Sequence, residues 1–193
     1  ARSSGADCVK FQMRDISSLY RKSLYRESLN IKNSNEDLGS EYVTDLLLKY
    51  QLSDDLMFKI FDYCHRKGIM PLCTPWDYKS VEKLNSYGME GFKVASADLV
   101  NHELLGSLIN TKKPLICSTG MSREDEIIDS VNLLKRAGAQ FSLLHCNATY
   151  PAPFKDINLS YLKRLSEIGQ CVVGYSSHER GISVAIASVV FGA

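Results

Sequence analysis

Two lysines stand inside short apolar runs of this 193-residue chain, where buried strands are expected. Lys10 lies in CVKFQ and Lys93 lies in FKVAS. An unpaired buried ammonium is costly, so each lysine needs an anionic partner or must lose its proton. Hydroxyl side chains stand at or near the ends of several of these runs: Thr74, Ser96, Ser118, Thr119 and Ser176. Cations and hydroxyls that meet at one place form an anion site, most naturally for phosphate together with carboxylate.

The apolar run before Ser176 also leads into a histidine. The sequence CVVG continues as Tyr175, Ser176, Ser177 and His178. Two hydroxyls and an imidazole therefore stand side by side where this predicted strand ends, and His178 either takes part in the site or caps the start of the following helix. His145 also stands near a strand end, but it comes earlier in its run, and we expect a hydrogen-bonded core histidine there. A single serine or histidine of this kind is usually structural, so the hypothesis depends on all the runs contributing at the same end.

The apolar runs alternate with segments of helical period, which predicts a parallel sheet covered by helices. The predicted strands are Cys8–Gln12, Met70–Pro75, Gly91–Ser96, Pro114–Thr119, Phe141–Asn147 and Cys171–Ser177. The predicted helices are Ser53–Lys67, with Ser53 as N-cap, Tyr78–Tyr87, Asn101–Asn110, Ser122–Ala137 and Asn158–Ile168, the last of them ending at Gly169. In such folds ligands sit at the carboxyl ends of the strands.

We predict an α/β fold of the (β/α)8 TIM-barrel type. Six strands in ~190 residues are about three quarters of such a barrel, which typically needs ~250 residues. A doubly wound open sheet is the alternative, although no G-x-G-x-x-G follows a strand. The long segment Met13–Gln51 is either a functional loop or a surface elaboration. The chain has no initiator methionine and ends after an apolar helical pattern, so we expect residues 1–193 to be one partial barrel domain of a longer protein, without a second domain.

The composition is that of an ordinary soluble domain, with 45% hydrophobic and 23% charged residues. A net charge of +1 gives no argument for nucleic acid or an anionic membrane as partner, and no apolar run is long enough to span a membrane. The six cysteines form no C-x-x-C pair and mostly lie in apolar runs, which favours free thiols in a reducing, cytoplasmic setting.

At these strand ends the chain resembles the sialic acid synthase family. The matching stretches are GADCVKFQ, TPWD, FKVASADL, ICSTGM, LLHCNATYPAP followed by DINL, and GYSSHERGI. The resemblance implies a (β/α)8 barrel, here covering about strands two to seven. It also implies condensation of phosphoenolpyruvate with an N-acylmannosamine-type aldehyde sugar, or its 6-phosphate, to give a sialic acid and phosphate. A divalent metal, Mn²⁺ or Mg²⁺, is the implied cofactor, and a homodimer is the implied state of the full-length protein.

The resemblance also assigns roles to individual residues. The positions that match contacts to the phosphoenolpyruvate carboxylate end are Lys10, Thr74 and Lys93. The positions that match contacts to its phosphate are Ser96, Ser118 and Ser176. The positions that match the sugar side are Gln12 and Tyr150. Asp98 matches an acidic residue that handles the attacking water, and His178 matches one of two metal-binding histidines, so the implied catalytic residues are Lys10, Lys93 and Asp98.

Some positions depart from the family pattern. Ala148 stands where some members place an asparagine that contacts phosphate, which leaves Asn147 as the candidate for this contact. Ser177 stands where many bacterial members have aspartate. The family's catalytic glutamate on the first strand and its second metal histidine on the eighth strand match nothing in residues 1–193. We therefore expect this stretch alone to be inactive.

Three alternatives remain open from the sequence. A related synthase would use a trideoxy diacetamido sugar, to give legionaminic or pseudaminic acid. A class I aldolase would use Lys93 or Lys10 as a Schiff-base amine. A non-catalytic barrel would only bind sugar phosphates.

Overall fold

The computed structural model describes residues 1–16 and 47–193 of the chain. Six strands form one sheet, in chain order: β1 (Cys8–Met13), β2 (Met70–Pro75), β3 (Phe92–Val94), β4 (Leu115–Ser118), β5 (Phe141–His145) and β6 (Val173–Tyr175). Each strand pairs in parallel with the next one. The predicted α/β fold with six parallel strands is therefore confirmed, and the doubly wound alternative is wrong because the strands follow one another without a reversal of order.

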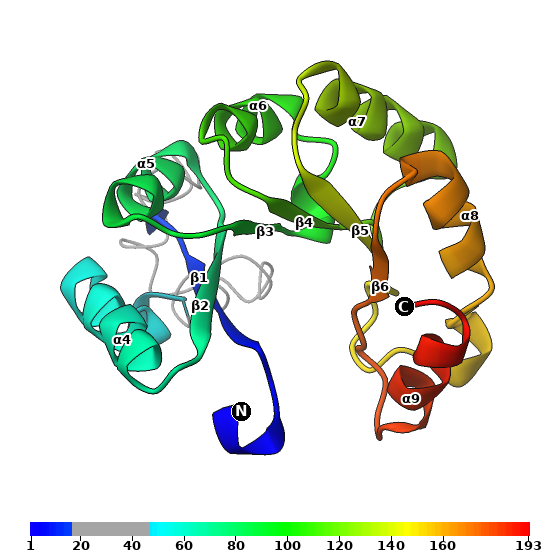
Figure 1. Ribbon diagram of the computed structural model, residues 1–193, viewed down its shortest axis with the longest axis horizontal. Helices are drawn as coiled ribbons and strands as arrows, with labels where there is room; N and C mark the ends of the chain where they lie inside the picture. The colour runs from blue at the N-terminus through cyan, green and yellow to red at the C-terminus, as the bar shows by residue number, and fades with distance from the viewer. Residues whose placement is uncertain (17–46) are drawn as a thin grey trace, which may run out of the picture.

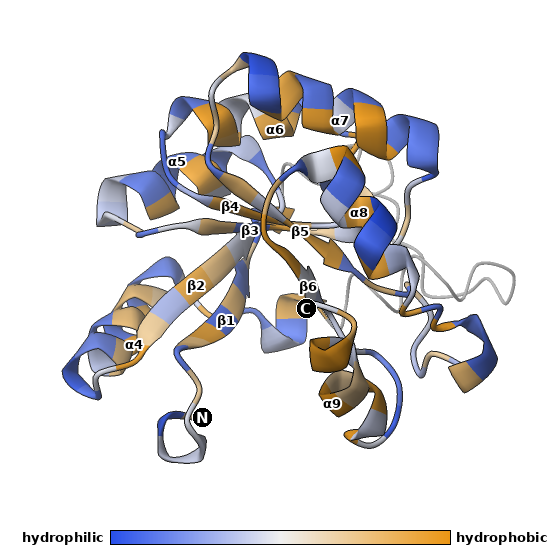
Figure 2. Ribbon diagram, turned by 45° about the vertical axis from the view of Figure 1, so that its right-hand side comes forward, coloured by the Kyte–Doolittle hydropathy of each residue, from blue (hydrophilic) through white to orange (hydrophobic). Residues whose placement is uncertain are grey.

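Helices connect the strands and lie on the outside of the arc that the strands form (Figure 1). They are α4 (Asp54–Arg66), α5 (Tyr78–Tyr87), α6 (His102–Asn110), α7 (Glu124–Arg136), α8 (Tyr161–Gly169) and α9 (Ser183–Val190). Three short 3-10 helices are η1 (Arg2–Ser4), η2 (Ser96–Asp98) and η3 (Phe154–Asp156). Most of the helices carry both hydrophilic and hydrophobic bands, whereas α9 is mostly hydrophobic (Figure 2). This banding is what helices with one face on a sheet require.

Side-chain caps fix where several helices begin. Ser53 Oγ accepts a hydrogen bond from the Leu56 N–H, as the sequence predicts. Asp77 caps α5 in the same way through the Ser80 N–H. The predicted start of α7 at Ser122 is wrong, because the helix begins at Glu124 and the Arg123 N–H donates to the Glu126 carboxylate.

Several predicted boundaries are also wrong, and the backbone explains them. Strand β3 ends at Val94 because the chain turns into η2, and β6 is limited to Val173–Tyr175. Helix α8 begins at Tyr161 and not at Asn158, whose φ of 46° is left-handed and cannot belong to a right-handed helix. Gly169 is the last helical residue, and Gln170 provides the left-handed position that follows.

The hydrophobic core fills the space between the sheet and its helices. Phe61, Leu84, Phe92, Leu105 and Leu134 are buried there. Phe11 packs its ring 5.5 Å from the Phe61 ring, on the helix side of β1. Since side chains alternate along a strand, the neighbours of Phe11 on β1, which are Lys10 and Gln12, lie on the inner face of the arc.

Among the described residues, no helix is long and apolar enough to cross a membrane. All six cysteines are free, as the sequence predicts. Most of the segment Met13–Gln51, predicted to be either a functional loop or a surface elaboration, lies outside the described residues.

Candidate anion-binding active site

One cavity of about 230 Å³ lies at the carboxyl ends of the strands. Every strand or the segment that follows it contributes to its wall. The residues that line it are Lys10, Gln12, Thr74, Trp76, Lys93, Ala95, Ser96, Ala97, Ser118, Met121, Ala148, Tyr150, Ser176 and His178. All of the sequence-predicted site residues except Asp98, Thr119 and Asn147 are therefore brought together. Parallel pairing causes this convergence, because it aligns all the carboxyl ends at one edge.

Lys93 projects from β3 into the cavity and is 8% exposed. Its ammonium donates hydrogen bonds to the Val94 carbonyl, at 2.8 Å, and to Ser118 Oγ. No carboxylate pairs with it within the part of the chain that the structure describes. Burial is the main cause that lowers the pKa of Lys93 to about 8, and the positive charge of Lys10 acts in the same direction. The site therefore holds a positive charge that an anion would stabilise.

Lys10 lies on β1, opposite Leu72 of β2. The expectation that Lys10 is buried is wrong, since its side chain is exposed. The physical reason is that β1 is an edge strand of the described sheet, so its inner face has a neighbour on one side only. Lys10 nevertheless lines the same cavity as Lys93, and the two ammonium groups are close enough to influence each other electrostatically.

Gln12 is held in place at the side of the cavity. Its Oε1 accepts hydrogen bonds from Trp76 Nε1, at 3.2 Å, and from Arg14 Nη2, at 2.5 Å. The Arg14 guanidinium also lies 5.0 Å from the Trp76 ring centroid, in cation–π contact. Because the Gln12 oxygen is occupied, its amide N–H₂ remains to donate towards a ligand. Sequence reasoning missed Trp76 as a site residue, although it stands in the TPWD turn after β2.

Thr74 and the serines supply hydroxyls with different surroundings. Thr74 is 2% exposed and Ser118 is 3% exposed, whereas Ser96 and Ser176 are half-buried. Ser176 is placed by its N–H, which donates to the His145 carbonyl at 2.9 Å. Thr119, which the sequence also suggested, turns its hydroxyl to the Leu144 carbonyl and does not line the cavity.

His178 is fixed from three directions. Its N–H donates to Glu179 Oε2, at 3.0 Å, and its carbonyl accepts from the Ala152 N–H, at 3.1 Å. Its Nδ1 lies 2.5 Å from the Asn147 carbonyl oxygen. A carbonyl can only accept, so Nδ1 carries the proton and the Nε2 lone pair is directed elsewhere. This is the tautomer that a metal-binding imidazole with a backbone acceptor adopts.

The Nε2 atom of His178 is in contact with a tyrosine. Tyr150 Oη lies 2.7 Å from it, and the two rings stack with centroids 4.0 Å apart. In the residues that the structure describes, no group of three or more His, Cys, Asp or Glu side chains could hold a metal ion. His178 therefore fits the role of one metal ligand, and the described residues do not form a complete metal site.

Asp98 and Asn147 lie beside the cavity, not in its wall. Asp98 belongs to η2, where its Oδ1 accepts from Asn101 and its Oδ2 is buried without a hydrogen-bond partner among the described residues. Burial raises the pKa of Asp98, which suits a carboxyl group that gives and takes protons. The Asn147 amide donates to the Asp156 carbonyl and accepts from the Thr149 N–H, so this side chain organises its own loop. The prediction that Asn147 replaces the missing phosphate contact at Ala148 has no support in this geometry.

His145 is the core histidine that the sequence predicts. It is 9% exposed and its Nε2 donates to the Ile157 carbonyl at 2.6 Å. Its ring also contacts Tyr161 and Tyr175. His145 is therefore engaged away from the cavity.

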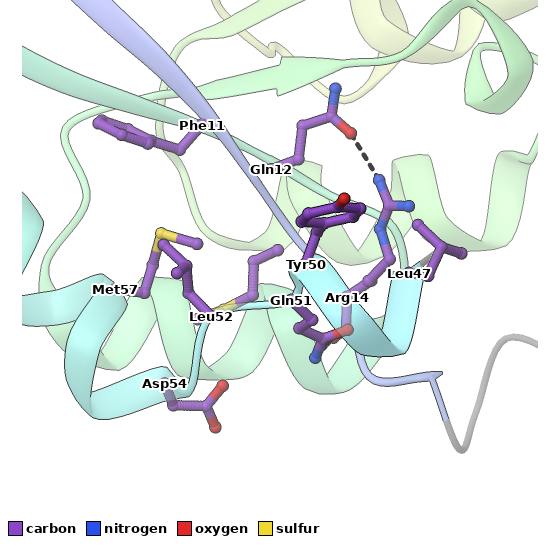
Figure 3. A pocket seen from close by; sticks show the side chains of 10 residues that line it. Phe11, Gln12, Arg14, Leu47, Tyr50, Gln51, Leu52, Asp54 and Met57 are labelled. Atoms are coloured by element: carbon purple, nitrogen blue, oxygen red, sulfur yellow. Dashed lines mark hydrogen bonds between the residues drawn. The ribbon is translucent and has the colours of Figure 1, made fainter. Parts of the chain in front are cut away.

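A larger hollow of about 390 Å³ lies near β1 and the start of α4 (Figure 3). Apolar side chains dominate its wall, among them Phe11, Leu52 and Met57, and Arg14 reaches from its edge to Gln12. No lysine, serine or threonine lines this larger hollow among the described residues. The smaller cavity is the better candidate site because the charges and the hydrogen-bond donors converge there.

The fold is a parallel α/β arrangement of the barrel type, and its cavity at the carboxyl ends of the strands has the charge and the hydrogen-bond donors that suit an anionic ligand. The chain belongs to the NeuB family, because the model of that family matches residues 1–193.

Comparison with known proteins gives the same class. An uncharacterized protein of Methanocaldococcus jannaschii, MJ1065, is 38% identical over all of this chain and 52% of its own length. The N,N'-diacetyllegionaminic acid synthase of Campylobacter jejuni is 34% identical over all of this chain and 58% of its length. The human N-acetylneuraminate-9-phosphate synthase is 27% identical over all of this chain and 53% of its length. The chain thus spans about half the length of these relatives.

Solved structures match the fold. The N-acetylneuraminic acid synthetase of Leptospira borgpetersenii, in complex with citrate, superposes with a TM-score of 0.84 at 26% identity, over 99% of this chain and 61% of that one. A truncated 3-deoxy-D-arabino-heptulosonate 7-phosphate synthase from Thermotoga maritima superposes with a TM-score of 0.63 at 15% identity, over 75% of this chain and 58% of that one. The second match concerns the fold alone.

Proposed function

We propose that this chain forms the phosphoenolpyruvate-binding part of a nonulosonic acid synthase. The reaction joins C3 of phosphoenolpyruvate to the aldehyde carbon of an N-acylmannosamine-type sugar, or its 6-phosphate, and releases phosphate. The observation that carries the proposal is the single cavity in which two lysines and four hydroxyls from different strands converge. Such a set matches a small ligand with a carboxylate at one end and a phosphate at the other.

The residues of the cavity divide into three groups under this proposal. Lys10, Lys93 and Thr74 hold the carboxylate end, and Ser96, Ser118 and Ser176 hold the phosphate. Gln12 and Tyr150 face the sugar. Holding both substrates in one orientation can lower a two-substrate barrier by roughly 7–11 kcal/mol in well-oriented cases.

The chemistry also needs a polarised aldehyde and a proton carrier. A divalent metal, Mn²⁺ or Mg²⁺, supplies Lewis-acid polarisation of the aldehyde oxygen when bound. His178 would provide one nitrogen ligand through Nε2, with the remaining ligands coming from water, substrate or groups outside the described residues. Asp98 handles the water that adds to C2 before phosphate leaves with C–O cleavage, which requires the η2 turn to bring its carboxyl group towards the ligand.

The sugar is the finer part of the proposal. A trideoxy diacetamido sugar is the second candidate, and the 34% identity to the Campylobacter jejuni N,N'-diacetyllegionaminic acid synthase favours it. Incubation of the full-length protein with phosphoenolpyruvate, Mn²⁺ and each candidate aldehyde in turn tests both. We expect sugar-dependent phosphate release with one of them and a nonulosonic acid product by mass spectrometry. No release with any acylated sugar, together with tight phosphoenolpyruvate binding, would favour a non-catalytic binding protein.

The class I aldolase remains a second candidate because of one observation, the lowered pKa of Lys93. A lysine that loses its proton near pH 8 is a competent Schiff-base amine. Two of its donor positions are engaged by Val94 and Ser118, which suits a fixed cation better than a nucleophile. Treatment with borohydride in the presence of pyruvate, and separately of the aldehyde sugar, distinguishes the two functions. Covalent labelling of Lys93 would identify the aldolase, and an unmodified mass supports the synthase.

A further inference from the structure

Cys146 lies behind the phosphate side of the cavity. It follows β5 directly and is 5% exposed. Its Sγ lies 3.1 Å from Ser96 Oγ, although the two residues are 50 positions apart in the chain. The Gly120 N–H donates to the same Ser96 oxygen, at 3.2 Å. Ser96 lines the cavity and Cys146 does not, so any effect of the thiol on a ligand has to pass through Ser96.

A serine hydroxyl has one hydrogen to donate and two lone pairs that accept. The Gly120 N–H occupies one lone pair of Ser96. If the Cys146 S–H donates to the second lone pair, the Ser96 O–H is left to point into the cavity. If Ser96 instead donates to the sulfur, its hydrogen is consumed and a lone pair faces the ligand. A phosphate group offers only acceptors here, so it binds to the first arrangement and is repelled by the second.

We propose that Cys146 is a positioning residue, whose S–H donates to Ser96 Oγ and so directs the Ser96 hydroxyl hydrogen to the phosphate of phosphoenolpyruvate. The inference rests on the proposed function and goes beyond it, since Cys146 touches neither substrate.

The thiol is held in place by close packing. A Cβ atom at Gly120 would lie 2.5 Å from Cys146 Sγ and 2.9 Å from its carbonyl oxygen. The absence of a side chain at Gly120 therefore allows the contact, and little room remains for the thiol to turn.

The competing interpretation is that Cys146 is a small apolar residue that fills space under the loop. Packing alone would make Cys146→Ala and Cys146→Ser differ in stability and leave the affinity for phosphoenolpyruvate unchanged. The positioning role instead predicts that the two variants differ in their affinity for phosphoenolpyruvate. Serine keeps a donor at this position and alanine removes it, so the two variants differ in affinity.

The test is calorimetric binding of phosphoenolpyruvate to the full-length protein, with a double-mutant cycle. We expect Cys146→Ala to raise the Kd about three- to tenfold, the range for loss of one net hydrogen bond, and Cys146→Ser to stay within about twofold of the parent. In a Ser96→Ala background, Cys146→Ala causes no further loss, because the hydroxyl that it orients is gone. Cys171→Ala removes a partly buried thiol that packs against the hydrophobic core and does not line the cavity, so it is the matched control and leaves the Kd unchanged. Thermal unfolding of each variant separates binding from folding.

Two outcomes count against the inference alone. One is that the alanine and serine variants bind equally well, and the other is that Cys146→Ala costs as much in the Ser96→Ala background as in the parent. If the parent protein itself does not bind phosphoenolpyruvate, the proposed function fails, and the inference fails with it. The two failures are therefore distinguishable from the parent's own titration.

Discussion

Lys93 gives the prediction that follows most directly from the structure. The pKa of this lysine falls from its ordinary value of 10.5 to about 8, mainly because the ammonium is buried. At about 1.36 kcal/mol per pKa unit, the charged form costs the folded protein about 3 kcal/mol relative to the unfolded chain. Replacement of Lys93 by methionine removes this cost. It also removes a donor from the Val94 carbonyl and from Ser118 Oγ, at about 1 kcal/mol each.

On balance, Lys93→Met should raise the free energy of unfolding by about 1 kcal/mol at pH 7 in the absence of ligand. In the proposed complex the Lys93 ammonium pairs with the carboxylate of phosphoenolpyruvate. The same variant should therefore raise the Kd for phosphoenolpyruvate at least tenfold, since hydrogen bonds to charged groups are worth about 1.5–3 kcal/mol. The assays are urea unfolding and calorimetric titration. Lys163→Met, at an exposed position of α8, is the control and should change neither quantity appreciably.

The pH dependence of the free energy of unfolding provides an independent check that the buried Lys93 charge is destabilising. Between pH 8 and about 10.5 the folded protein binds fewer protons at Lys93 than the unfolded chain does, so the free energy of unfolding rises with pH across this window. Between pH 7 and pH 10, the free energy of unfolding of the parent protein should therefore rise by about 2 kcal/mol relative to that of Lys93→Met. Over the same range, the affinity of the parent protein for phosphoenolpyruvate should fall above pH 8. If Lys93→Met is less stable than the parent at both pH values and binds phosphoenolpyruvate normally, the reasoning is refuted.

Three further predictions concern the rest of the site. His178→Ala in the full-length protein should abolish Mn²⁺-dependent activity and leave the phosphoenolpyruvate Kd within about threefold of the parent, because lysines and hydroxyls hold that ligand; near-normal activity at limiting Mn²⁺ would contradict the ligand role. Tyr150→Phe should lower the Kd for Mn²⁺ by about two- to tenfold in a spin-resonance titration, since it removes the hydroxyl bound to His178 Nε2, and weaker or unchanged binding would count against this. Gly120→Ala should lower the free energy of unfolding in urea by about 1–3 kcal/mol, because its Cβ meets Cys146, and it should also weaken phosphoenolpyruvate binding. Gly138→Ala is the control. Its Cβ meets nothing within 4 Å but its φ of 65° is left-handed, so it should lower stability and leave phosphoenolpyruvate binding unchanged.

The strands and their common end could be predicted from the sequence because the pattern is local. Apolar runs bounded by turn residues mark buried parallel strands, and chain order fixes which ends meet. The convergence of Lys93, Thr74 and Ser118 follows from that rule alone. The exposure of Lys10 goes with the edge position of β1 in the described sheet, which agrees with the expectation that residues 1–193 cover about strands two to seven of a barrel.

Other features depend on tertiary contacts that no local pattern carries. His178 is held by the Asn147 carbonyl, 31 positions away, and by the Glu179 carboxylate. The sequence places Glu179 next to His178 but does not indicate that its carboxylate accepts from the His178 N–H. The pairing of Cys146 with Ser96 has the same character, since an apolar run with one cysteine predicts only a small buried side chain. Asp98 shows the converse, because its motif marks it as functional although the structure places it beside the cavity and not in the wall.

The central claim is that phosphoenolpyruvate bound in this cavity gives up its phosphate to form a carbon–carbon bond. Phosphoenolpyruvate labelled with ¹⁸O in its bridging oxygen tests this most directly, with the full-length protein, Mn²⁺ and an N-acylated amino-sugar aldehyde. The account predicts that phosphate is released only when the sugar is present, and that the released phosphate carries the ¹⁸O because the C–O bond breaks. Release without the sugar, or label retained in the organic product, would contradict it.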